Sequence, residues 1–337
     1  MLREHFKKAF LGKDNLTDIL GQDKAKEDIK SALLMGRHMI IVGPPGVGKT
    51  TLAKNIAKLL PEITVNNCPY NCLPEEPICP ECLNAKGKVK SKKIPGEKRF
   101  VRIQGSPDLT PEDLLGDIDP IKAMKFGPLS VEAFSPGKIF KANNGILFFD
   151  EVNRCPEKLQ NALLQVLEEG KITIGSYEID FPVNFIFIGT MNPDDRSTEP
   201  LSDVFLDRFD FAYMSYPEEL ETEMRIVSEK GEKIIDFPEK LLRFVISFIR
   251  NMRTNKDLEK LPSVRASIGV YERAQSNAYL KGRKSVEPDD IEEVMVSVLS
   301  HRITLKPAIR FVTTTEELIK KEIRQAMDEL AEKGGYL

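Results

Sequence analysis

Short apolar runs alternate with helical patterns over much of the chain. Three of these runs are rich in β-branched or aromatic residues, as is typical of strands buried on both faces of a parallel sheet. They comprise residues 39–42, 145–149 and 184–189. Segments with the apolar spacing of helices lie around them, at residues 23–35, 52–60 and 156–169. The alternation predicts an α/β fold in which helices cover both faces of a parallel sheet.

The pattern changes after Tyr216-Pro217, where the strand-like runs stop. The remainder has helical character, at residues 218–231, 238–254, 263–282, 287–301 and 314–333. The segment at 287 has a clear helix start, because Pro288 and two aspartates occupy its first turn. We therefore predict two domains, an α/β core at residues 1–216 and a helical domain with a C-terminal helix at residues 217–337.

Two stretches of the core depart from the main pattern. Between residues 61 and 105 the chain is dominated by Pro, Cys, Lys and Gly. Residues 62–104 are therefore predicted to form a Cys-rich insertion with little regular structure. Residues 171–181 alternate in polarity around Gly175-Ser176, which predicts a β-hairpin.

Composition and charge narrow the class of protein. The 337 residues are 41% hydrophobic and 30% charged, which excludes a disordered or fibrous chain. No run approaches the ~18 consecutive apolar residues of a membrane span. Residues 1–13 lack the features of a secretion signal, so we expect a soluble, cytoplasmic protein with no membrane partner. A net charge of −3 gives no support to nucleic acid as the main partner, and the basic stretch at 86–99 is interpreted as a solvated loop.

One loop carries a phosphate-binding motif. Residues 43–50 satisfy the G-x-x-x-x-G-K-[ST] pattern and lie between a predicted strand and a predicted helix. Glycines let backbone N–H groups turn toward phosphate oxygens, Lys49 would reach the β- and γ-phosphates, and the Thr50 hydroxyl would bind Mg²⁺. The predicted nucleotide-binding residues here are Gly43, Pro44, Pro45, Gly46, Val47, Gly48, Lys49, Thr50 and Thr51.

Two acids, Asp150 and Glu151, end the second buried run. We expect them at the carboxyl edge of the sheet, where folds of this kind bind their ligands. Asp150 would hold Mg²⁺ through water, and Glu151 would polarise the water that attacks the γ-phosphate. Together with the phosphate loop, the pair predicts a P-loop NTPase that hydrolyses ATP with Mg²⁺ as its cofactor.

With these motifs in place, the sequence resembles the AAA+ ATPases, and within them the magnesium chelatase I subunit and its MoxR relatives. Beyond the two nucleotide motifs, the resemblance rests on the runs Leu60–Val65, Pro69–Asn71, Ala133–Gly137 and Lys141–Asn153. It extends over most of the chain, and it implies that the helical domain is the lid of the ATPase.

The resemblance also implies roles for residues outside the two motifs. Asn192, after the third predicted strand, matches sensor 1, which reports the state of the γ-phosphate. Arg208 matches the arginine finger that acts on the nucleotide of a neighbouring subunit, and Arg265 resembles sensor 2 of the lid. Gly21 and Gln22 belong to a segment similar to the one that packs on adenine.

Two insertions typical of this family would lie at residues 104–136 and 170–182. The resemblance implies that such insertions line the surface of a ring and move a partner. It also implies that the active species is a ring, with a hexamer as the expected assembly.

Four of the five cysteines crowd into one short segment, with the spacing C-x₃-C followed by C-x₂-C. They are Cys68, Cys72, Cys79 and Cys82. In a reducing compartment such clustering argues for metal rather than disulfides, and four thiolates suit a structural Zn²⁺. An iron–sulfur cluster and the absence of any metal stay open as alternatives. A metal here would pin the insertion and would not be needed for ATP hydrolysis.

The favoured function is the ATPase component of a magnesium chelatase-type ligase, which drives metal insertion into a tetrapyrrole by remodelling a partner. Only helical segments follow residue 217, so a von Willebrand-type domain would have to come from a separate subunit, beside a large chelatase subunit. One alternative is a MoxR-type chaperone that acts with a von Willebrand-type partner on other complexes. The other is a nucleic-acid motor, which the basic stretch at 86–99 keeps open.

Overall fold

A computed structural model of the chain describes residues 2–11, 15–85, 89–128, 130–174, 179–193, 195 and 201–332. The chain divides into two compact units. The first contains residues 1–44 and 48–214, and the second contains residues 45–47 and 215–337. The boundary in the structure therefore lies between Met214 and Ser215, whereas the sequence pattern placed it after residue 216.

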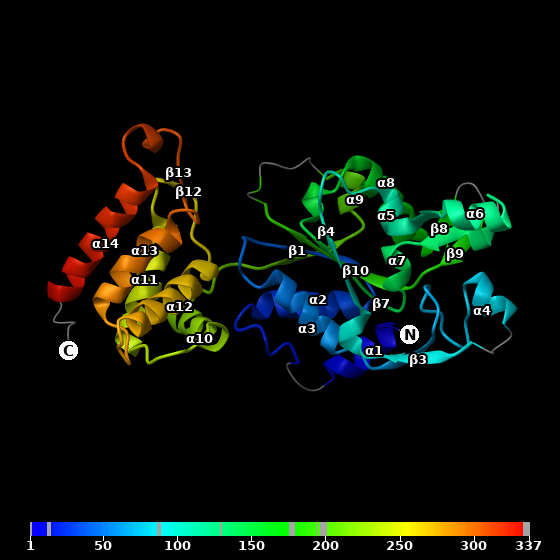
Figure 1. Cartoon of the computed structure of the whole chain (residues 1–337), viewed down its shortest axis with the longest axis horizontal. Helices are drawn as coiled ribbons and strands as arrows, with labels where there is room; N and C mark the ends of the chain where they lie inside the picture. Colours follow the sequence, from blue (N-terminus) through cyan, green and yellow to red (C-terminus); the bar gives the residue numbers. More distant parts are fainter. Residues whose placement is uncertain are drawn as a thin grey trace. The chain divides into compact units, whose positions relative to one another are not determined.

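A parallel sheet forms the centre of the first unit (Figure 1). Among the described residues it has five strands, in the order β11-β1-β10-β7-β4. Every neighbouring pair in this order is parallel. The strands are β1 (Met39–Val42), β4 (Phe100–Gln104), β7 (Gly145–Asp150), β10 (Phe185–Met191) and β11 (Asp210–Tyr213). The predicted α/β fold is confirmed, and its three predicted strands are β1, β7 and β10.

The central strands are buried on both faces because helices cover both sides of the sheet (Figure 1). Helices α2 (Asp23–Leu34) and α3 (Lys49–Lys58) lie on one side, and α8 (Glu157–Glu169) lies on the other. Leu147 and Phe149 of β7 share a core cluster with Leu159 of α8. This two-sided burial explains why β1, β7 and β10 have nearly continuous apolar sequences.

The two outer strands, β4 and β11, were not predicted. The physical reason is that each lies at an edge of the sheet and is only partly buried. Of the five residues of β4 only Ile103 is buried, and of the four in β11 only Ala212 is buried. Arg102 and Gln104 interrupt the apolar residues of β4, and β11 begins with Asp210, so neither strand has the apolar run of a central one.

The insertion is more regular than predicted. Its strands β2 (Ile63–Asn66) and β3 (Ser91–Ile94) pair in an antiparallel ladder, and α4 (Pro80–Asn84) lies in the connection between them. Residues 100–104 belong to the central sheet rather than to the insertion. The expectation of little regular structure over residues 62–104 is therefore wrong, because pairing between distant segments supplies the order that local composition does not show.

The remaining elements of the first unit surround the sheet. The hairpin predicted at residues 171–181 is present as β8 (Lys171–Ile174) and β9 (Ile179–Pro182), while Gly175-Ser176 lie outside the described residues. The others are α1 (Leu2–Phe10), η1 (Gly96–Arg99), α5 (Pro111–Leu115), β5 (Gly116–Ile118), α6 (Pro120–Phe126), η2 (Val131–Ala133), β6 (Phe134–Pro136), α7 (Lys138–Lys141), η3 (Val152–Arg154) and α9 (Asp203–Leu206).

The second unit is mainly helical. Its helices are α10 (Leu220–Lys230), α11 (Glu239–Thr254), α12 (Val264–Leu280), α13 (Pro288–Leu299) and α14 (Thr315–Glu332). A short antiparallel pair, β12 (Leu258–Lys260) with β13 (Thr304–Leu305), and η4 (Ile309–Phe311) complete the described part, and the strand pair was not predicted. Of the helices in the described part of the chain, none combines the length and the apolar character that crossing a bilayer requires.

A fully buried carboxylate joins three parts of the second unit. Glu223 of α10 accepts two hydrogen bonds from Arg253 of α11, each at 2.7 Å, and one from the Ser267 hydroxyl of α12 at 2.8 Å. Arg253 also donates to the carbonyl of Pro262, just ahead of α12. Removing one partner of such a buried pair costs about 3–5 kcal/mol. The network therefore fixes the start of α12, the helix that carries Arg265.

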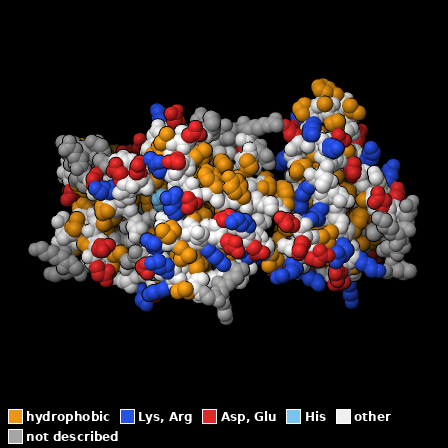
Figure 2. Space-filling model, turned by 180° about the vertical axis from the view of Figure 1, so that it is seen from behind, with side chains coloured by type: hydrophobic (Ala, Val, Ile, Leu, Met, Phe, Trp, Pro, Cys, Tyr) orange, Lys and Arg blue, Asp and Glu red, His pale blue; other side chains and the backbone are white. Residues whose placement is uncertain are grey.

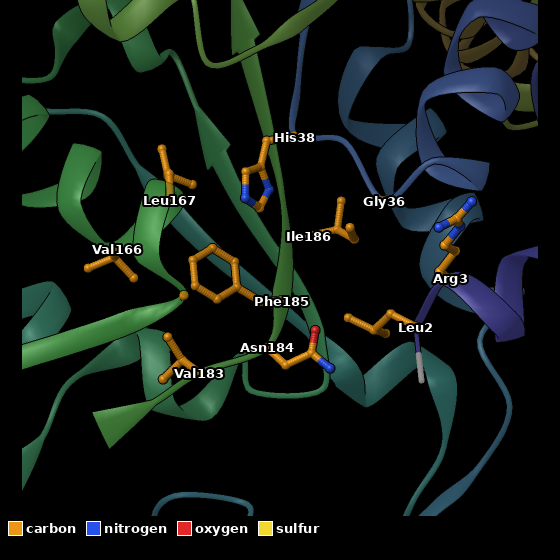
Figure 3. Close-up of a pocket in the computed structure, with 11 residues that line it drawn as sticks. Leu2, Arg3, Gly36, His38, Val166, Leu167, Val183, Asn184, Phe185 and Ile186 are labelled. Carbon is orange, nitrogen blue, oxygen red and sulfur yellow. The ribbon is translucent and has the colours of Figure 1, made fainter. Parts of the chain in front are cut away.

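A pocket of about 260 Å³ opens at the amino edge of the sheet (Figure 3). His38, which precedes β1, and Phe185, the first residue of β10, lie side by side in it with ring centroids 5.8 Å apart. The backbone N–H of Phe187 donates to His38 Nδ1 at 3.0 Å, so the imidazole is held in its neutral form. Burial lowers the pKa of His38 to about 4.

His38 is expected to make the first unit sensitive to acid. Its pKa is about 6.5 when the chain is unfolded and about 4 when folded, so protonation favours the unfolded chain. The stability that this implies is fully present above pH ~6.5 and is lost as the pH falls toward 4, by about 2 kcal/mol between pH 7 and pH 5. Urea denaturation of the protein and of His38→Gln at both pH values measures it. An equal pH dependence in the two proteins would contradict this assignment.

Candidate functional site

The phosphate loop connects β1 to α3 at the carboxyl edge of the sheet. Gly46 and Gly48 have φ values of +78° and +101°, which side-chain-bearing residues rarely adopt. Gly43 lies against the backbone of Met214, where a Cβ would collide with the carbonyl oxygen. The loop therefore needs its glycines for its path. It leads directly into α3, whose first N–H groups have no partner within the helix and can bind phosphate.

Lys49, Thr50 and Thr51 form the first turn of α3. The Lys49 ammonium donates to the carbonyl oxygens of Gly43 and Pro44, at 2.6 and 2.9 Å. These contacts hold the ammonium against the backbone of the loop. Thr50 is partly buried at the base of the loop and Thr51 is exposed.

The strand register brings the other predicted residues to the same edge. Val42, the last residue of β1, lies opposite Met191 of β10, so the loop and Asn192 begin side by side. On the far side of β10, Gly189 lies opposite Phe149, which places Asp150 and Glu151 beside Thr190 and Asn192. The phosphate loop, the two acids and Asn192 are therefore neighbours along one edge.

Thr190 joins the two acids. Its hydroxyl donates to Asp150 Oδ1 at 2.6 Å and accepts from the backbone N–H of Glu151 at 3.0 Å. Thr190 is almost fully buried, so these bonds are protected from water. One side chain on β10 thus fixes both the carboxylate of Asp150 and the backbone turn at Glu151.

Glu151 has a left-handed backbone, with φ at +57°, which turns the chain sharply at the end of β7. Its carboxylate accepts from the Gln104 amide at 3.0 Å and pairs with Arg154 at 3.3 Å. Arg154 also pairs with Asp195 at 2.8 Å. A backbone in this uncommon region at a site residue costs about 1–3 kcal/mol and is often tied to function. Here the turn leaves the Glu151 carboxylate at the carboxyl edge, where Gln104 of β4 hydrogen-bonds it.

Asp150 and Thr50 are the oxygen donors that could hold Mg²⁺. Carboxylate and hydroxyl oxygens are the donors that this hard ion prefers, so the pair fits the cofactor. Arg102 of β4 donates to Asp150 Oδ2 at 2.6 Å, so a positive charge lies directly against the carboxylate. Because the Arg102 side chain is 49% exposed, it can leave the carboxylate without disturbing the core.

The segment with Gly21 and Gln22 lies beside the phosphate loop. Both residues have left-handed backbones, with φ of +65° and +62°, and Gln22 caps α2. The Ile19 side chain lies 3.1 Å from the position that a Cβ on Gly48 would take. Lys58 of α3 pairs with Asp18 at 2.8 Å. The structure therefore brings this segment alongside α3, with Ile19 near the start of the helix and Asp18 paired with its last residue.

Arg208 lies at the amino edge of the sheet, on the opposite side from the carboxyl edge that carries the phosphate loop. It precedes β11, whose first residue, Asp210, is opposite Met39 at the start of β1. Four residues of β1, at ~3.3 Å each, separate this edge from the phosphate loop by about 13 Å. The Arg208 guanidinium pairs with Glu168 and Asp207, both at 3.2 Å. It does not join the other predicted residues in the first unit.

Arg265 lies in the second unit, in the first turn of α12, where it is exposed. The buried Glu223 network described above holds the start of this helix.

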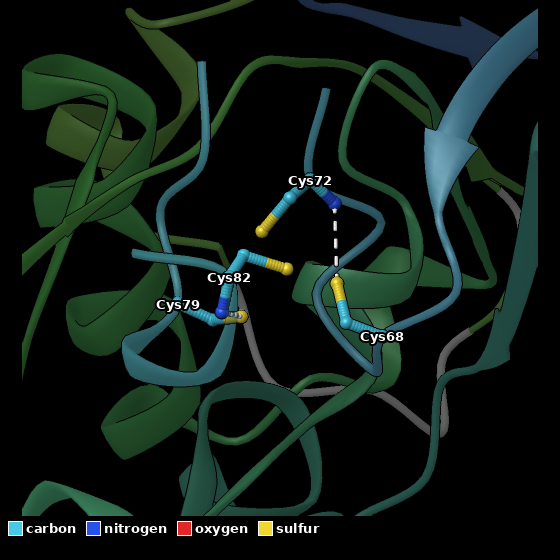
Figure 4. Close-up of side chains that lie close together, drawn as sticks. All are labelled: Cys68, Cys72, Cys79 and Cys82. Atoms are coloured by element: carbon cyan, nitrogen blue, oxygen red, sulfur yellow. Dashed lines mark hydrogen bonds between the residues drawn. The ribbon is translucent and has the colours of Figure 1, made fainter. Parts of the chain in front are cut away.

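The four clustered cysteines form a separate group within the insertion. All four are buried, and their Sγ atoms lie within 4.8 Å of one another (Figure 4). Lys86 and Lys88 of the basic stretch lie outside the described residues.

Sequence reasoning missed three residues of this site: Arg102, Gln104 and Thr190. Each contacts an acid through the pairing of strands that are distant in the sequence, so no local motif contains it. The signal available was the polar end of each strand, since Gln104 and Thr190 both lie where a strand reaches the carboxyl edge.

A parallel sheet with a phosphate loop after its first strand, and two acids at the end of another, defines a P-loop NTPase. Comparisons with known proteins place the chain more closely. Family models match in three places: "Magnesium chelatase, subunit ChlI" at residues 15–69, "ATPase family associated with various cellular activities (AAA)" at 85–211 and "AAA lid domain" at 252–322.

Similar proteins cover nearly the whole chain. The magnesium-chelatase subunit ChlI of Synechocystis sp. is 30% identical, with 86% of this chain and 88% of that protein covered. The magnesium-chelatase subunit ChlI homolog of Methanocaldococcus jannaschii is 28% identical, with 93% and 90% covered. A solved BchI–BchD complex of magnesium chelatase has a TM-score of 0.49 at 23% identity, with 90% of this chain and 98% of that chain covered. The chain belongs to the AAA+ ATPases of the magnesium-chelatase subunit ChlI family.

Proposed function

We propose that the chain is the ATP-hydrolysing motor subunit of a magnesium chelatase-type complex, in which it remodels a partner that inserts metal into a tetrapyrrole. The observation that carries the ATPase part is the shared edge of the sheet, where Lys49, Asp150, Glu151 and Asn192 lie beside the phosphate loop. The chelatase part is supported by the similarity to ChlI proteins over nearly the full length.

The proposal gives each side chain a task. The loop N–H groups and the Lys49 ammonium bind the phosphate chain and offset its charge. The Glu151 carboxylate, placed at the carboxyl edge by its left-handed backbone, accepts a hydrogen bond from the attacking water and orients it toward the γ-phosphorus. Asn192 contacts the γ-phosphate from the next strand. When bound, Mg²⁺ at Thr50 and Asp150 would neutralise charge on the β- and γ-phosphates.

Arg208 supports the proposal that the active species is a ring, which we take to be a hexamer. About 13 Å of strand separates it from the phosphate loop of its own chain. An arginine at that edge can act on a nucleotide only if it serves a neighbouring subunit. Arg265 would contact the γ-phosphate from the lid and couple the nucleotide state to lid movement.

Exposed apolar residues support action on a partner. Ile121 and Met124 of α6, in the insertion at 104–136, are 80% and 92% exposed. In the second unit, Phe311 and Val312 are exposed at the connection between β13 and α14, where Figure 2 shows apolar side chains gathered at an outer tip. Exposed apolar groups of this kind mark interaction surfaces. We propose a separate von Willebrand-type subunit and a large porphyrin-binding subunit as the partners.

Replacing Lys49 by alanine tests the ATPase part. The substitution removes charge-assisted hydrogen bonds to the phosphates, each worth about 1.5–3 kcal/mol, so ATP affinity should fall by about 100-fold or more. Calorimetric titration with ATP and Mg²⁺ measures it. Lys54→Ala is the matched control, because Lys54 is an exposed lysine on the same helix. Tight ATP binding by Lys49→Ala would refute the phosphate-loop assignment.

A reconstitution tests the chelatase part. Mixed with the two partner subunits of its host, a porphyrin, Mg²⁺ and ATP, the protein should support metal insertion, followed by porphyrin fluorescence, and Lys49→Ala should not. If insertion fails while a von Willebrand-type protein stimulates ATP hydrolysis, the chaperone function holds instead. Stimulation by DNA alone would favour a nucleic-acid motor.

A further inference from the structure

The four cysteines come from two turns of the β2–β3 connection and face a common centre (Figure 4). Cys68 and Cys72 belong to the first turn, and Cys79 and Cys82 to the second, where Cys79 caps α4. All four thiols are free and buried, which sets them apart from solvent-exposed surface cysteines.

The spacing of the four sulfur atoms fits a single metal ion better than an iron–sulfur cluster. Four sulfurs bound to a single Zn²⁺ at ~2.3 Å form a tetrahedron with edges of about 3.8 Å. The observed separations, within 4.8 Å, are close to that size. An iron–sulfur cluster binds its four cysteines through different iron atoms and so holds them further apart.

Backbone N–H groups already point at three of the sulfurs. Cys72 N–H donates to Cys68 Sγ at 3.5 Å, Ile78 N–H to Cys72 Sγ at 3.3 Å and Cys82 N–H to Cys79 Sγ at 3.4 Å. Such bonds stabilise thiolates and spread the net negative charge of a four-thiolate zinc site. The two turns therefore present hydrogen-bond donors to the sulfurs, as a site of four metal-bound thiolates requires.

We propose that Cys68, Cys72, Cys79 and Cys82 bind a single Zn²⁺, and that this ion holds Tyr70 in place as a clasp between two insertions of the ATPase core. The proposal is independent of which partner the motor acts on.

Tyr70 lies within the first cysteine turn, and its ring is buried in an aromatic cluster. Its centroid is 4.9 Å from that of Phe140 in α7, edge to face, and 5.7 Å from that of Phe181 in β9, stacked. Phe134 of β6 packs at 6.0 Å on both Phe140 and Phe181. Each such aromatic pair is worth about 0.5–1.5 kcal/mol beyond its buried area. Tyr70 thus joins the cysteine turn to the β8–β9 hairpin and to the insertion at 104–136.

Hydrogen bonds fix the same turn to the core. Asn71 donates to the carbonyl of Lys141 at 2.9 Å, and Asn143 donates to that of Tyr70 at 3.3 Å. Asn143 also accepts from the backbone N–H of Asn184, next to β10. Through these contacts the turn is attached to the segment just ahead of β7. The phosphate loop follows a different strand, β1. Loss of the ion should loosen the hairpin and leave nucleotide binding intact.

Metal analysis tests the site. The full-length protein, purified in reducing buffer and dialysed against EDTA, should retain about one zinc per chain. Replacement by Co²⁺ should give the visible bands and thiolate charge-transfer absorption of a tetrahedral four-sulfur site. Cys79→Ser should lose the metal, and Cys155→Ser, which changes the buried cysteine outside the cluster, should keep it. Iron with inorganic sulfide, or a metal-free protein with four reactive thiols, would overturn the proposal.

Hydrogen exchange tests the clasp. Stripping zinc from the folded protein with a thiol-reactive mercurial and chelator should speed exchange in β8, β9 and α7 by about tenfold or more, with α3 unchanged. Tyr70→Leu should keep the zinc, since Tyr70 is not a ligand, and should still loosen the hairpin. Unchanged exchange in the hairpin after zinc loss would overturn the clasp. ATP binding to the zinc-free protein is expected to be unchanged. This measurement distinguishes a failure of the clasp from a failure of the ATPase assignment.

Discussion

Replacing Glu151 by glutamine is expected to leave ATP bound but to lower turnover by about 10²–10⁴-fold. The amide cannot accept a proton from water, and a positioned general base usually contributes a factor of about 10²–10⁴ to the rate. The phosphate loop is untouched, so nucleotide affinity should stay within about threefold of the original protein. Steady-state kinetics and ATP titration, done on the same preparation, measure the two effects separately.

The glutamine side chain introduced at position 151 has nearly the same shape as the native glutamate. Gln104 can still hydrogen-bond the new amide, and the left-handed backbone at this position is equally accessible to both residues. Glu157→Gln is the control, because Glu157 is exposed at the start of α8, a few residues further on. If Glu151→Gln kept more than a tenth of the turnover, another residue would have to orient the water.

The centre of the fold could be predicted because each of its strands is a contiguous apolar run in the sequence. β1, β7 and β10 are covered on both faces, so every residue in them is under pressure to be apolar. β4 and β11 are the two outermost strands of the sheet, and only one residue of each is buried. Their stability comes from pairing with β7 and β1, which a single pass along the sequence cannot detect.

The same distinction applies to the site. The phosphate loop and the Asp150-Glu151 pair are contiguous motifs, and the structure gathers them at one edge as expected. Thr190 and Gln104 contact the two acids only because of the register in which their strands pair with β7. A shift of one residue in either strand would turn these side chains to the other face of the sheet. Their role emerges only when the strands are paired.

The insertion shows a third case. Its Pro, Cys and Lys content indicates a loop. Ile63, Thr64 and Val65 are β-branched and favour a strand, but the run is too short to predict one without its partner. The order comes from the antiparallel partner Ser91–Ile94 and from packing of Tyr70 and the cysteines into the main core cluster. The spacing of the cysteines was informative, but only the structure showed that the two turns converge.

Arg208→Ala is expected to lower turnover by about 10³–10⁵-fold without weakening ATP binding, the effect of removing an arginine finger supplied in trans. A structural role predicts something different. The pairs of Arg208 with Glu168 and Asp207 are partly exposed, so their loss should change the free energy of unfolding by only ~0–1 kcal/mol. The Arg208 Nε is buried without a hydrogen-bond partner among the described residues, so its removal relieves a cost. Arg225→Ala, at an exposed arginine of α10, is the control.

Mixing two inactive variants decides whether Arg208 acts across an interface. An Arg208→Ala subunit keeps its own phosphate loop and Glu151 but offers no guanidinium to its neighbour. A Glu151→Gln subunit offers the guanidinium but cannot activate water. In rings formed from equal amounts, about a quarter of the interfaces combine one intact site with one intact arginine, because assembly is random. Turnover should therefore recover to about that fraction of the original rate, and it should rise with protein concentration as rings form. No recovery at any mixing ratio, in rings shown by sedimentation to contain both variants, would mean that Arg208 serves a different purpose.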